Sequence, residues 1–179
     1  MQNWLFLKGS NDDIDYIGIQ RLIRSIAKSD LKSKIKVLIA GNIEDYLSDI
    51  VNKNKFVQPL GYLDADLMKK AIDSCTIGFG SLELYKINLN EASTLKVRQY
   101  ANNGLPFIIG YHDSDISEID EFKGLFMQVP NDNSDLPITE IYNWAANVNT
   151  PENKQTLRNL SKKHLSWTSK MKTLINALT

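Results

Sequence analysis

The sequence predicts an α/β fold in which helices cover both faces of a doubly wound, parallel sheet of about six strands, followed by a C-terminal helical segment. Three observations lead to this prediction. Short apolar runs end in glycine or in polar residues, which is typical of buried strands followed by loops. Segments with apolar residues at helical spacing follow most of these runs. The regular alternation of the two kinds of segment favours right-handed crossovers between parallel strands.

The predicted elements follow one another along the whole chain. The strands are expected within residues 3–8, 34–41, 56–64, 76–81, 106–111 and 125–130. The helices are expected at residues 14–26, 42–54 and 64–75, from residue 93 or 94 to a Gly-Leu-Pro turn, and from 136 to 179 with a break at Thr150–Pro151. Asp64 or Asp66 is expected to cap the third helix. With neither an internal repeat nor a linker, residues 1–179 are expected to form a single domain.

Composition restricts the ligands and partners of the chain. Lysine plus arginine equals aspartate plus glutamate at 21 each, so no overall charge attracts nucleic acid, and we expect no nucleic-acid partner. Cys75 is the one cysteine, and His112 and His164 are the two histidines. A disulfide and a cysteine-based zinc site are therefore excluded, and we predict neither a metal nor a cofactor. Cys75 and His164 are expected to be structural.

No apolar run approaches the roughly 20 residues that span a bilayer. The N-terminus also lacks the basic and apolar regions of a signal peptide. We therefore expect no transmembrane segment and a cytoplasmic location.

Ligands of doubly wound sheets bind beyond the carboxyl ends of the strands, where loops lead into helices. Glycine loops follow the first four predicted strands at this edge: Gly9–Ser10, Gly41–Asn42, Gly61–Tyr62 and Gly80–Ser81. These loops are the first candidates for a binding site.

The stretch NEASTLKVRQYANNGLPFIIG, residues 90–110, places a helix start at the same edge. Ser93 and Thr94 are good capping residues, so the helix is expected to begin near them. The backbone N–H groups of Thr94, Leu95 and Lys96 would then point out of the helix end. With the positive end of the helix dipole and the charge of Lys96, they would form an anion site.

Glu91 and Gln99 lie on either side of this helix start, and both side chains can accept hydrogen bonds from hydroxyl groups. A ligand with phosphate in the middle and polyols at each end would match the pattern. The alternative is that Ser93 and Thr94 only cap the helix, that Glu91 favours the helix dipole, and that Gln99 is solvated.

This stretch, with VQPLGYLDADLMKKAIDSCTIGFGSL ahead of it, resembles the C-terminal nucleotide-sugar-binding domain of GT-B retaining glycosyltransferases of the group 1, or family 4-like, type. The resemblance extends from LFLKGS to Ser166–Trp167. The mark of the family is two glutamates separated by seven residues, the second in a helix that ends in Gly-x-Pro. Glu91 matches the first glutamate and Gln99 occupies the position of the second. The resemblance implies a Rossmann-like fold.

The resemblance also implies roles for these residues. Glu91 would lie by the hydroxyls of the donor sugar, as a catalytic residue. The second glutamate usually holds both ribose hydroxyls, whereas Gln99 can accept from one and must present its NH₂ group to the other. Ser93 and the backbone N–H groups around Thr94 and Leu95 would hold the diphosphate.

The remaining implied contacts come from loops after the strands. The Gly9–Ser10 loop would approach the diphosphate, and Tyr62 and Leu63 would lie near the base. Family members carry basic residues close to the diphosphate; here Lys8 and Lys86 are the nearby candidates, and Lys86 is the preferred catalytic cation.

A GT-B enzyme has two such halves, and this chain provides one. We therefore expect the donor-binding half of a hexosyltransferase that uses a nucleotide-diphosphate sugar, with the N-terminal acceptor-binding domain absent and the isolated domain inactive. The complete enzyme would serve bacterial surface polysaccharide synthesis in the cytoplasm or peripherally at the inner membrane. Two alternatives stay open: half of a nucleotide-sugar 2-epimerase, and a non-catalytic domain that binds a nucleotide or a partner.

Overall fold

The computed structural model describes residues 1–9, 16–43 and 45–178. Within them, all strand pairs of the sheet are parallel, and the strand order is β3-β2-β1-β4-β5-β6. The strands are β1 (Gln2–Leu7), β2 (Ile35–Ala40), β3 (Val57–Gly61), β4 (Ile77–Phe79), β5 (Phe107–Ile109) and β6 (Phe126–Gln128). The predicted doubly wound α/β fold is confirmed, and the order reverses between β1 and β4.

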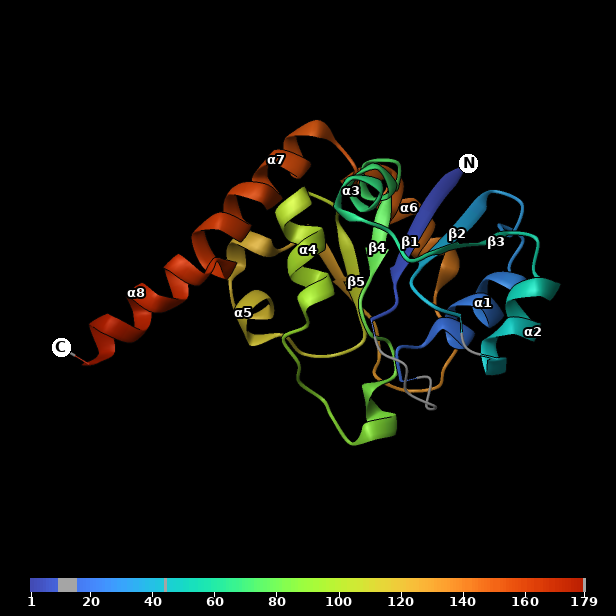
Figure 1. Cartoon of the computed structure of the whole chain (residues 1–179), viewed down its shortest axis with the longest axis horizontal. Coiled ribbons are helices and arrows are strands. Elements are labelled where there is room, and N and C mark those ends of the chain that lie inside the picture. The colour runs from blue at the N-terminus through green and yellow to red at the C-terminus, as the bar shows by residue number, and fades with distance from the viewer. Residues whose placement is uncertain (10–15, 44, 179) are drawn as a thin grey trace.

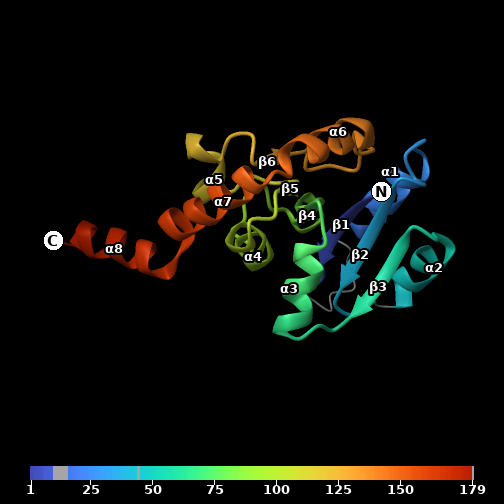
Figure 2. The same ribbon diagram turned by 90° about the horizontal axis from the view of Figure 1, so that it is seen from above.

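Helices cover both faces of this sheet (Figure 2). One face carries α1 (Ile19–Ala27), α2 (Asp45–Lys53) and α6 (Ile138–Val148); the other carries α3 (Ala65–Asp73) and α4 (Leu95–Asn103), with α7 (Pro151–Leu160) against α4. The chain ends in α8 (Trp167–Leu178), which extends away from the body of the molecule (Figure 1). The short elements are η1 (Leu84–Ile87), α5 (Ser114–Ser117), η2 (Asp120–Phe122) and the π-helical turn η3 (Ser161–Leu165).

Helix boundaries agree with the predicted caps except at the first helix. Asp64 caps α3, because its carboxylate accepts from the Leu67 N–H at 2.8 Å. The first helix was expected from residue 14 and begins only at Ile19. Gly18 precedes it with φ +87°, and a Cβ there would come within 2.7 Å of Leu82 Cβ. A left-handed glycine in close contact with another loop therefore delays the helix.

The core lies between the sheet and its two helical layers, and aromatic residues of the central strands fill it. Trp4 and Phe6 of β1 and Phe79 of β4 are fully buried. The ring centroid of Phe79 lies 5.5 Å from that of Trp4 and 6.0 Å from that of Phe6. These contacts fix the central strands against each other, at the place where the strand order reverses.

A tyrosine hydroxyl ends the pairing of β1 with β4. The ladder joins Phe6 to Phe79, and one further step would bring the Leu7 N–H to the Phe79 carbonyl. Instead, the Tyr100 hydroxyl accepts from Leu7 N at 3.0 Å and donates to Phe79 O at 3.0 Å. The Tyr100 ring lies over Gly78, where a Cβ would be 2.9 Å from ring atoms. Complete burial raises the pKa of Tyr100 far above its usual value, so the hydroxyl stays protonated.

No helix in the described part of the chain is long and apolar enough to cross a membrane.

We expect Tyr100→Phe to lower the free energy of unfolding by about 2 to 3 kcal/mol, because two buried backbone groups lose their partner. Urea denaturation followed by circular dichroism measures this change. Tyr142→Phe is the matched control: Tyr142 is half-buried, so we expect a loss below about 0.5 kcal/mol. Equal stability of the two variants would contradict the role given to the Tyr100 hydroxyl.

Candidate functional site

A cavity of about 410 Å³ opens at the carboxyl edge of the sheet. The loops after β1, β2 and β3 and the first turns of α3 and α4 form it. Its lining residues are Leu7, Lys8, Gly9, Ala40, Gly41, Tyr62, Leu63, Met68, Thr94, Leu95, Lys96 and Gln99. A second hollow of about 290 Å³ shares Gly9, Thr94 and Lys96 with it and extends past Ser81 and Ala92.

Glycine allows the loops on the floor of this cavity to approach each other. Gly41 has φ +118°, and a Cβ there would lie 2.3 Å from the Lys8 carbonyl oxygen. The Lys8 N–H donates to Ala40 O at 2.8 Å, and the Gly41 N–H donates to Gly61 O at 2.8 Å. The ends of β1, β2 and β3 are thus held together by backbone hydrogen bonds, and only glycine fits at position 41.

The start of α4 forms one wall. Thr94 directly precedes the helix, close to the predicted start, and its backbone is extended, but its hydroxyl makes no capping hydrogen bond. It lies 2.7 Å from the Tyr111 hydroxyl instead, and the Ser93 hydroxyl accepts from Arg98 Nη2 at 2.5 Å. The predicted capping hydrogen bonds of these two hydroxyls are therefore absent, although Thr94 does occupy the position that precedes the helix. The first-turn N–H groups, from Leu95 onward, have no acceptor within the helix.

Lys96 places a cation between the two hollows, because it lines both of them. Its Nζ lies 5.7 Å from the centroid of the Phe6 ring, which is within cation–π range. The ammonium group therefore lies over the end of β1, beside the N-terminus of α4. The Lys96 ammonium group and the N-terminus of α4 both favour the binding of an anion at this edge.

The structure brings together most of the residues that the sequence predicted for donor binding. Those that line the cavity are Gly9, Tyr62, Leu63, Thr94, Leu95, Lys96 and Gln99. Gln99 is exposed on the second turn of α4, and Tyr62 is 78% exposed in the loop after β3. Ser93 lies just outside the lining, and Ser10 lies outside the described residues.

The two predicted catalytic residues lie farther from the cavity. Lys86 pairs with the buried carboxylate of Glu83 at 2.7 Å and lines neither hollow. Lys8, the candidate that was not preferred, lines the larger cavity together with Lys96. Glu91 is exposed and is followed directly by Ala92, which lines the smaller hollow.

Two hydrogen bonds hold the backbone around Glu91. The His112 N–H donates to Asn90 O at 2.9 Å, and the Ala92 N–H donates to His112 O at 3.1 Å. They form a short parallel bridge between Glu91 and His112. The loop that carries Glu91 is therefore fixed to the chain that follows β5.

An ionic network that the sequence analysis missed joins α4 to this same region. The Arg98 guanidinium binds both carboxylate oxygens of Asp113, one of them at 2.8 Å, and Asp115 at 3.0 Å. The Asp113 side chain is fully buried. Burial alone would raise the pKa of Asp115, but its hydrogen bond to Lys170 and the charges of Lys170 and Arg98 lower that pKa overall. In the sequence, the two aspartates Asp113 and Asp115 shortly after a predicted strand could have indicated this network.

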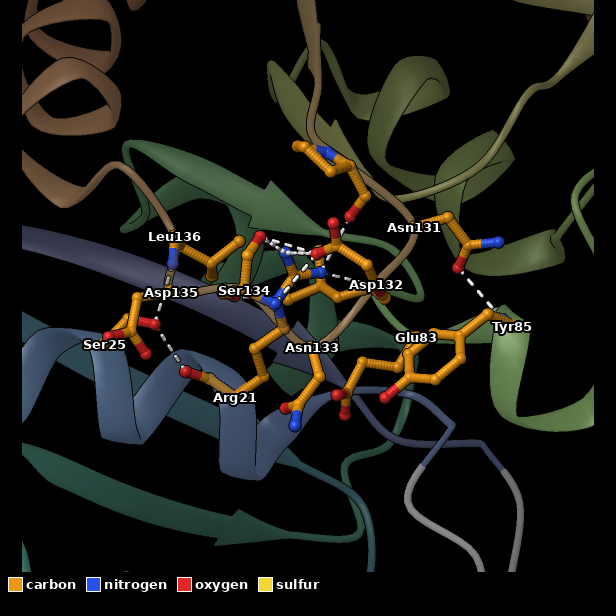
Figure 3. Close-up of polar contacts among 12 residues, drawn as sticks. Arg21, Ser25, Glu83, Tyr85, Asn131, Asp132, Asn133, Ser134, Asp135 and Leu136 are labelled. Atoms are coloured by element: carbon orange, nitrogen blue, oxygen red, sulfur yellow. Dashed lines mark hydrogen bonds and ion pairs between the residues drawn. The ribbon is translucent and has the colours of Figure 1, made fainter.

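A second network fixes the chain that leads to Glu91 (Figure 3). The Asn131 side chain accepts from Tyr85 N at 3.0 Å and donates to Leu89 O at 2.8 Å. The buried Arg21 donates to Leu82 O and to Pro130 O, both at 2.8 Å. The loop after β6 thereby braces the segment between β4 and α4.

Cys75 and His164 occupy structural positions, as expected. Cys75 is buried, and burial raises the pKa of its thiol to about 11. His164 Nε2 lies 2.8 Å from Glu121 and its ring packs edge-on against Phe122. No three His, Cys, Asp or Glu side chains gather around a possible metal position in the described ranges.

Comparison with solved structures shows what this fold is similar to. The catalytic domain of cholesterol-α-glucosyltransferase from Helicobacter pylori matches with a TM-score of 0.61 at 14% identity, covering 92% of this chain and 98% of that one. Sucrose-phosphate synthase from Thermosynechococcus elongatus matches with a TM-score of 0.68 at 16% identity, and the match covers 99% of this chain and 45% of that one. HepE from Anabaena, solved in complex with UDP-glucose, matches with a TM-score of 0.64 at 10% identity, and the match covers 98% of this chain and 48% of that one.

These similar proteins are GT-B glycosyltransferases, and the chain has the fold of a GT-B C-terminal domain. No family model and no curated protein matches the sequence. The chain spans about half the length of sucrose-phosphate synthase and of HepE, and nearly all of the chain solved for the Helicobacter pylori enzyme. The resemblance seen in the sequence is thus confirmed at the level of the fold.

We expect Arg98→Gln to lower the free energy of unfolding by about 3 kcal/mol, because the buried Asp113 carboxylate loses its counterion. Urea denaturation at neutral pH measures the loss. The double variant Arg98→Gln/Asp113→Asn removes the unpaired charge as well and should regain part of the stability. If the double variant is no more stable than the single one, the buried charge is not the cause.

Proposed function

We propose that this domain binds the nucleoside diphosphate part of a nucleotide-activated sugar and is the donor-binding half of a glycosyltransferase. The cavity at the carboxyl edge carries this proposal. It is lined by the end of β1 and by the start of α4, next to the place where the strand order reverses, and seven of the residues predicted from the sequence line it. The fold similarity to glycosyltransferases, among them HepE with UDP-glucose, supports the same assignment.

The polar groups along the cavity match the successive parts of such a donor. The α4 N-terminus and Lys96 supply positive potential for the diphosphate. Gln99 and Tyr62 line the larger cavity but not the smaller hollow that reaches Ala92 beside Glu91, so we assign the ribose and base to them. The smaller hollow, which extends to Ala92 beside Glu91, is the assigned place of the sugar.

The proposed chemistry uses these groups in a complete enzyme. As the bond between sugar and diphosphate breaks, negative charge grows on the leaving diphosphate. The α4 N-terminus and Lys96 would stabilise that charge, because they are already oriented toward it. Glu91 would contact the sugar hydroxyls, and the configuration of the transferred sugar would be retained, as the resemblance implies. Lys86 lines neither hollow and is therefore a weaker candidate for the catalytic cation than Lys96, which lines both.

The mouth of the cavity exposes apolar side chains. Leu95 is 86% exposed and Tyr62 is 78% exposed, although both line the cavity. Such residues favour a covering partner, and we assign that place to an acceptor-binding domain. We further propose that the donor carries a hexose and that the complete enzyme serves bacterial surface polysaccharide synthesis. That enzyme would lie in the cytoplasm or peripherally at the inner membrane. The isolated domain is expected to lack transferase activity.

Calorimetry with UDP, GDP and ADP and their sugars tests the proposal. We expect weak binding, at micromolar to millimolar concentrations, of at least one nucleoside diphosphate, because the proposed acceptor-binding domain would supply the other side of the cleft. Lys96→Gln should weaken that binding about tenfold and leave the free nucleoside unaffected. No heat with any of these ligands at millimolar concentration would remove the binding assignment.

Gln99→Glu tests the position of the ribose. A carboxylate accepts from both ribose hydroxyls, so we expect nucleoside diphosphate binding to strengthen by about 1 to 2 kcal/mol in calorimetry. Repulsion from the phosphates opposes this gain, but the α4 dipole reduces that repulsion.

A 2′-deoxy nucleotide is the control, and it should lose most of the gain. Glu91→Ala is the matched variant for the sugar, and it should weaken only the sugar-bearing ligand. An equal gain of Gln99→Glu on ribo and deoxy ligands would mean that Gln99 does not contact the ribose.

A further inference from the structure

A basic pocket lies at the opposite, amino-terminal edge of the sheet, where β2 and β3 begin and α1 and α2 end. Its volume is about 580 Å³. Ile35 and Phe56 are apolar parts of its lining, and four lysines also line it: Lys32, Lys36, Lys53 and Lys55. Neither the fold comparison nor the proposed donor site accounts for this pocket.

The charge of the basic pocket is not balanced locally. The residues that line it include no aspartate or glutamate. Lys53 contacts Asp49 at 3.5 Å, but both side chains are largely exposed, and such pairs are weak. Within the described ranges, no carboxylate pairs with Lys32, Lys36 or Lys55. The whole chain has a formal net charge of zero, so this is a local concentration of positive charge.

A structural role explains only one of the four lysines. A cation in the last turn of a helix stabilises the negative end of the helix dipole, and Lys53 lies in the last turn of α2. Lys32 lies in the turn after α1, Lys36 lies on β2, and Lys55 precedes β3. These three stand outside any helix, and each adds positive charge to the lining of the pocket.

The backbone beneath the lysines is held in place. The Gln2 N–H donates to Lys34 O at 2.9 Å, and the Val37 N–H donates to Phe56 O at 2.8 Å. Ile35 is buried, and the half-buried Phe56 packs against the core. The lysines therefore project from fixed positions around an apolar surface, which favours an anion that carries an apolar part.

We propose that the basic pocket binds a phosphate-bearing anion with a compact apolar part, at a site separate from the donor cavity. The two sites lie at opposite ends of the six-residue strand β2, roughly 20 Å apart. One ligand of ordinary size cannot fill both, so the proposal does not rest on the donor assignment. A soluble phosphorylated compound and an anionic phospholipid headgroup carry the same chemistry.

Two probes test the basic pocket at low ionic strength: inorganic pyrophosphate in calorimetry, and co-sedimentation with phosphatidylglycerol or phosphatidylcholine vesicles. The test variant is Lys32→Gln/Lys36→Gln/Lys55→Gln. The matched control, Lys70→Gln/Lys123→Gln/Lys162→Gln, changes the net charge equally at exposed lysines that line none of the cavities described above. Pyrophosphate also fits the donor cavity, so amide NMR shifts of Ile35 and Phe56 report the basic pocket separately.

We expect shifts at Ile35 and Phe56 on addition of pyrophosphate, and at least a tenfold weakening of that binding in the test variant but not in the control. UDP affinity should be the same in both variants. If the protein sediments with phosphatidylglycerol vesicles but not with phosphatidylcholine vesicles, and the test variant does not sediment, the ligand is a lipid headgroup. Pyrophosphate binding without sedimentation identifies a soluble ligand. Equal weakening in both variants, or no binding of either probe, would overturn the proposal.

Discussion

The candidate site depends on the place of one hydroxyl group. Tyr100 O–H stands between the Leu7 N–H and the Phe79 carbonyl, where β1 and β4 would otherwise continue to pair. Since a hydroxyl both accepts and donates, the strands separate without leaving a buried backbone group unsatisfied. They separate where the strand order reverses, and doubly wound sheets bind ligands there. Tyr100 also belongs to α4, so the same residue opens the sheet and anchors the helix whose N-terminus faces the opening.

The sequence of α4 gives the helix three different sides. Val97, Tyr100 and Ala101 are fully buried and hold the helix against the sheet. Lys96 and Gln99, three residues apart, lie on the side that lines the cavity. Arg98, between them in sequence, points to the buried Asp113. Packing of the buried residues fixes the distance of α4 from the sheet. The ion pair of Arg98 with Asp113 fixes the orientation of α4 about its own axis, and the contact of Arg98 with the Ser93 hydroxyl holds the chain just before the helix. The first-turn N–H groups are therefore oriented before any ligand arrives.

The sequence was sufficient for features that depend on neighbouring residues. Alternating apolar runs predicted the strands, Asp64 was one of the two residues predicted as a cap, and the start of α4 was predicted within two residues. Features that depend on distant residues were missed. The first helix starts late because Gly18 touches Leu82, and the Thr94 hydroxyl contacts Tyr111 instead of capping the helix. In both cases the partner lies on another segment, which residue spacing alone does not show. The Lys86–Glu83 pair is different, because the two residues are three apart in sequence and the pair was simply overlooked.

The two edges of the sheet are suited to anions by different physical means. At the carboxyl edge, aligned N–H groups at the α4 N-terminus act together with Lys96. Hydrogen bonds from fixed donors depend weakly on salt, because they act at contact distance. At the amino-terminal edge, α1 and α2 present their C-terminal ends, whose dipoles disfavour anions. Lysine side chains supply positive charge there, and salt screens exposed charges. The carboxyl edge can therefore select a ligand by the positions of its hydrogen-bonding groups, whereas the amino-terminal edge can select a ligand mainly by its charge.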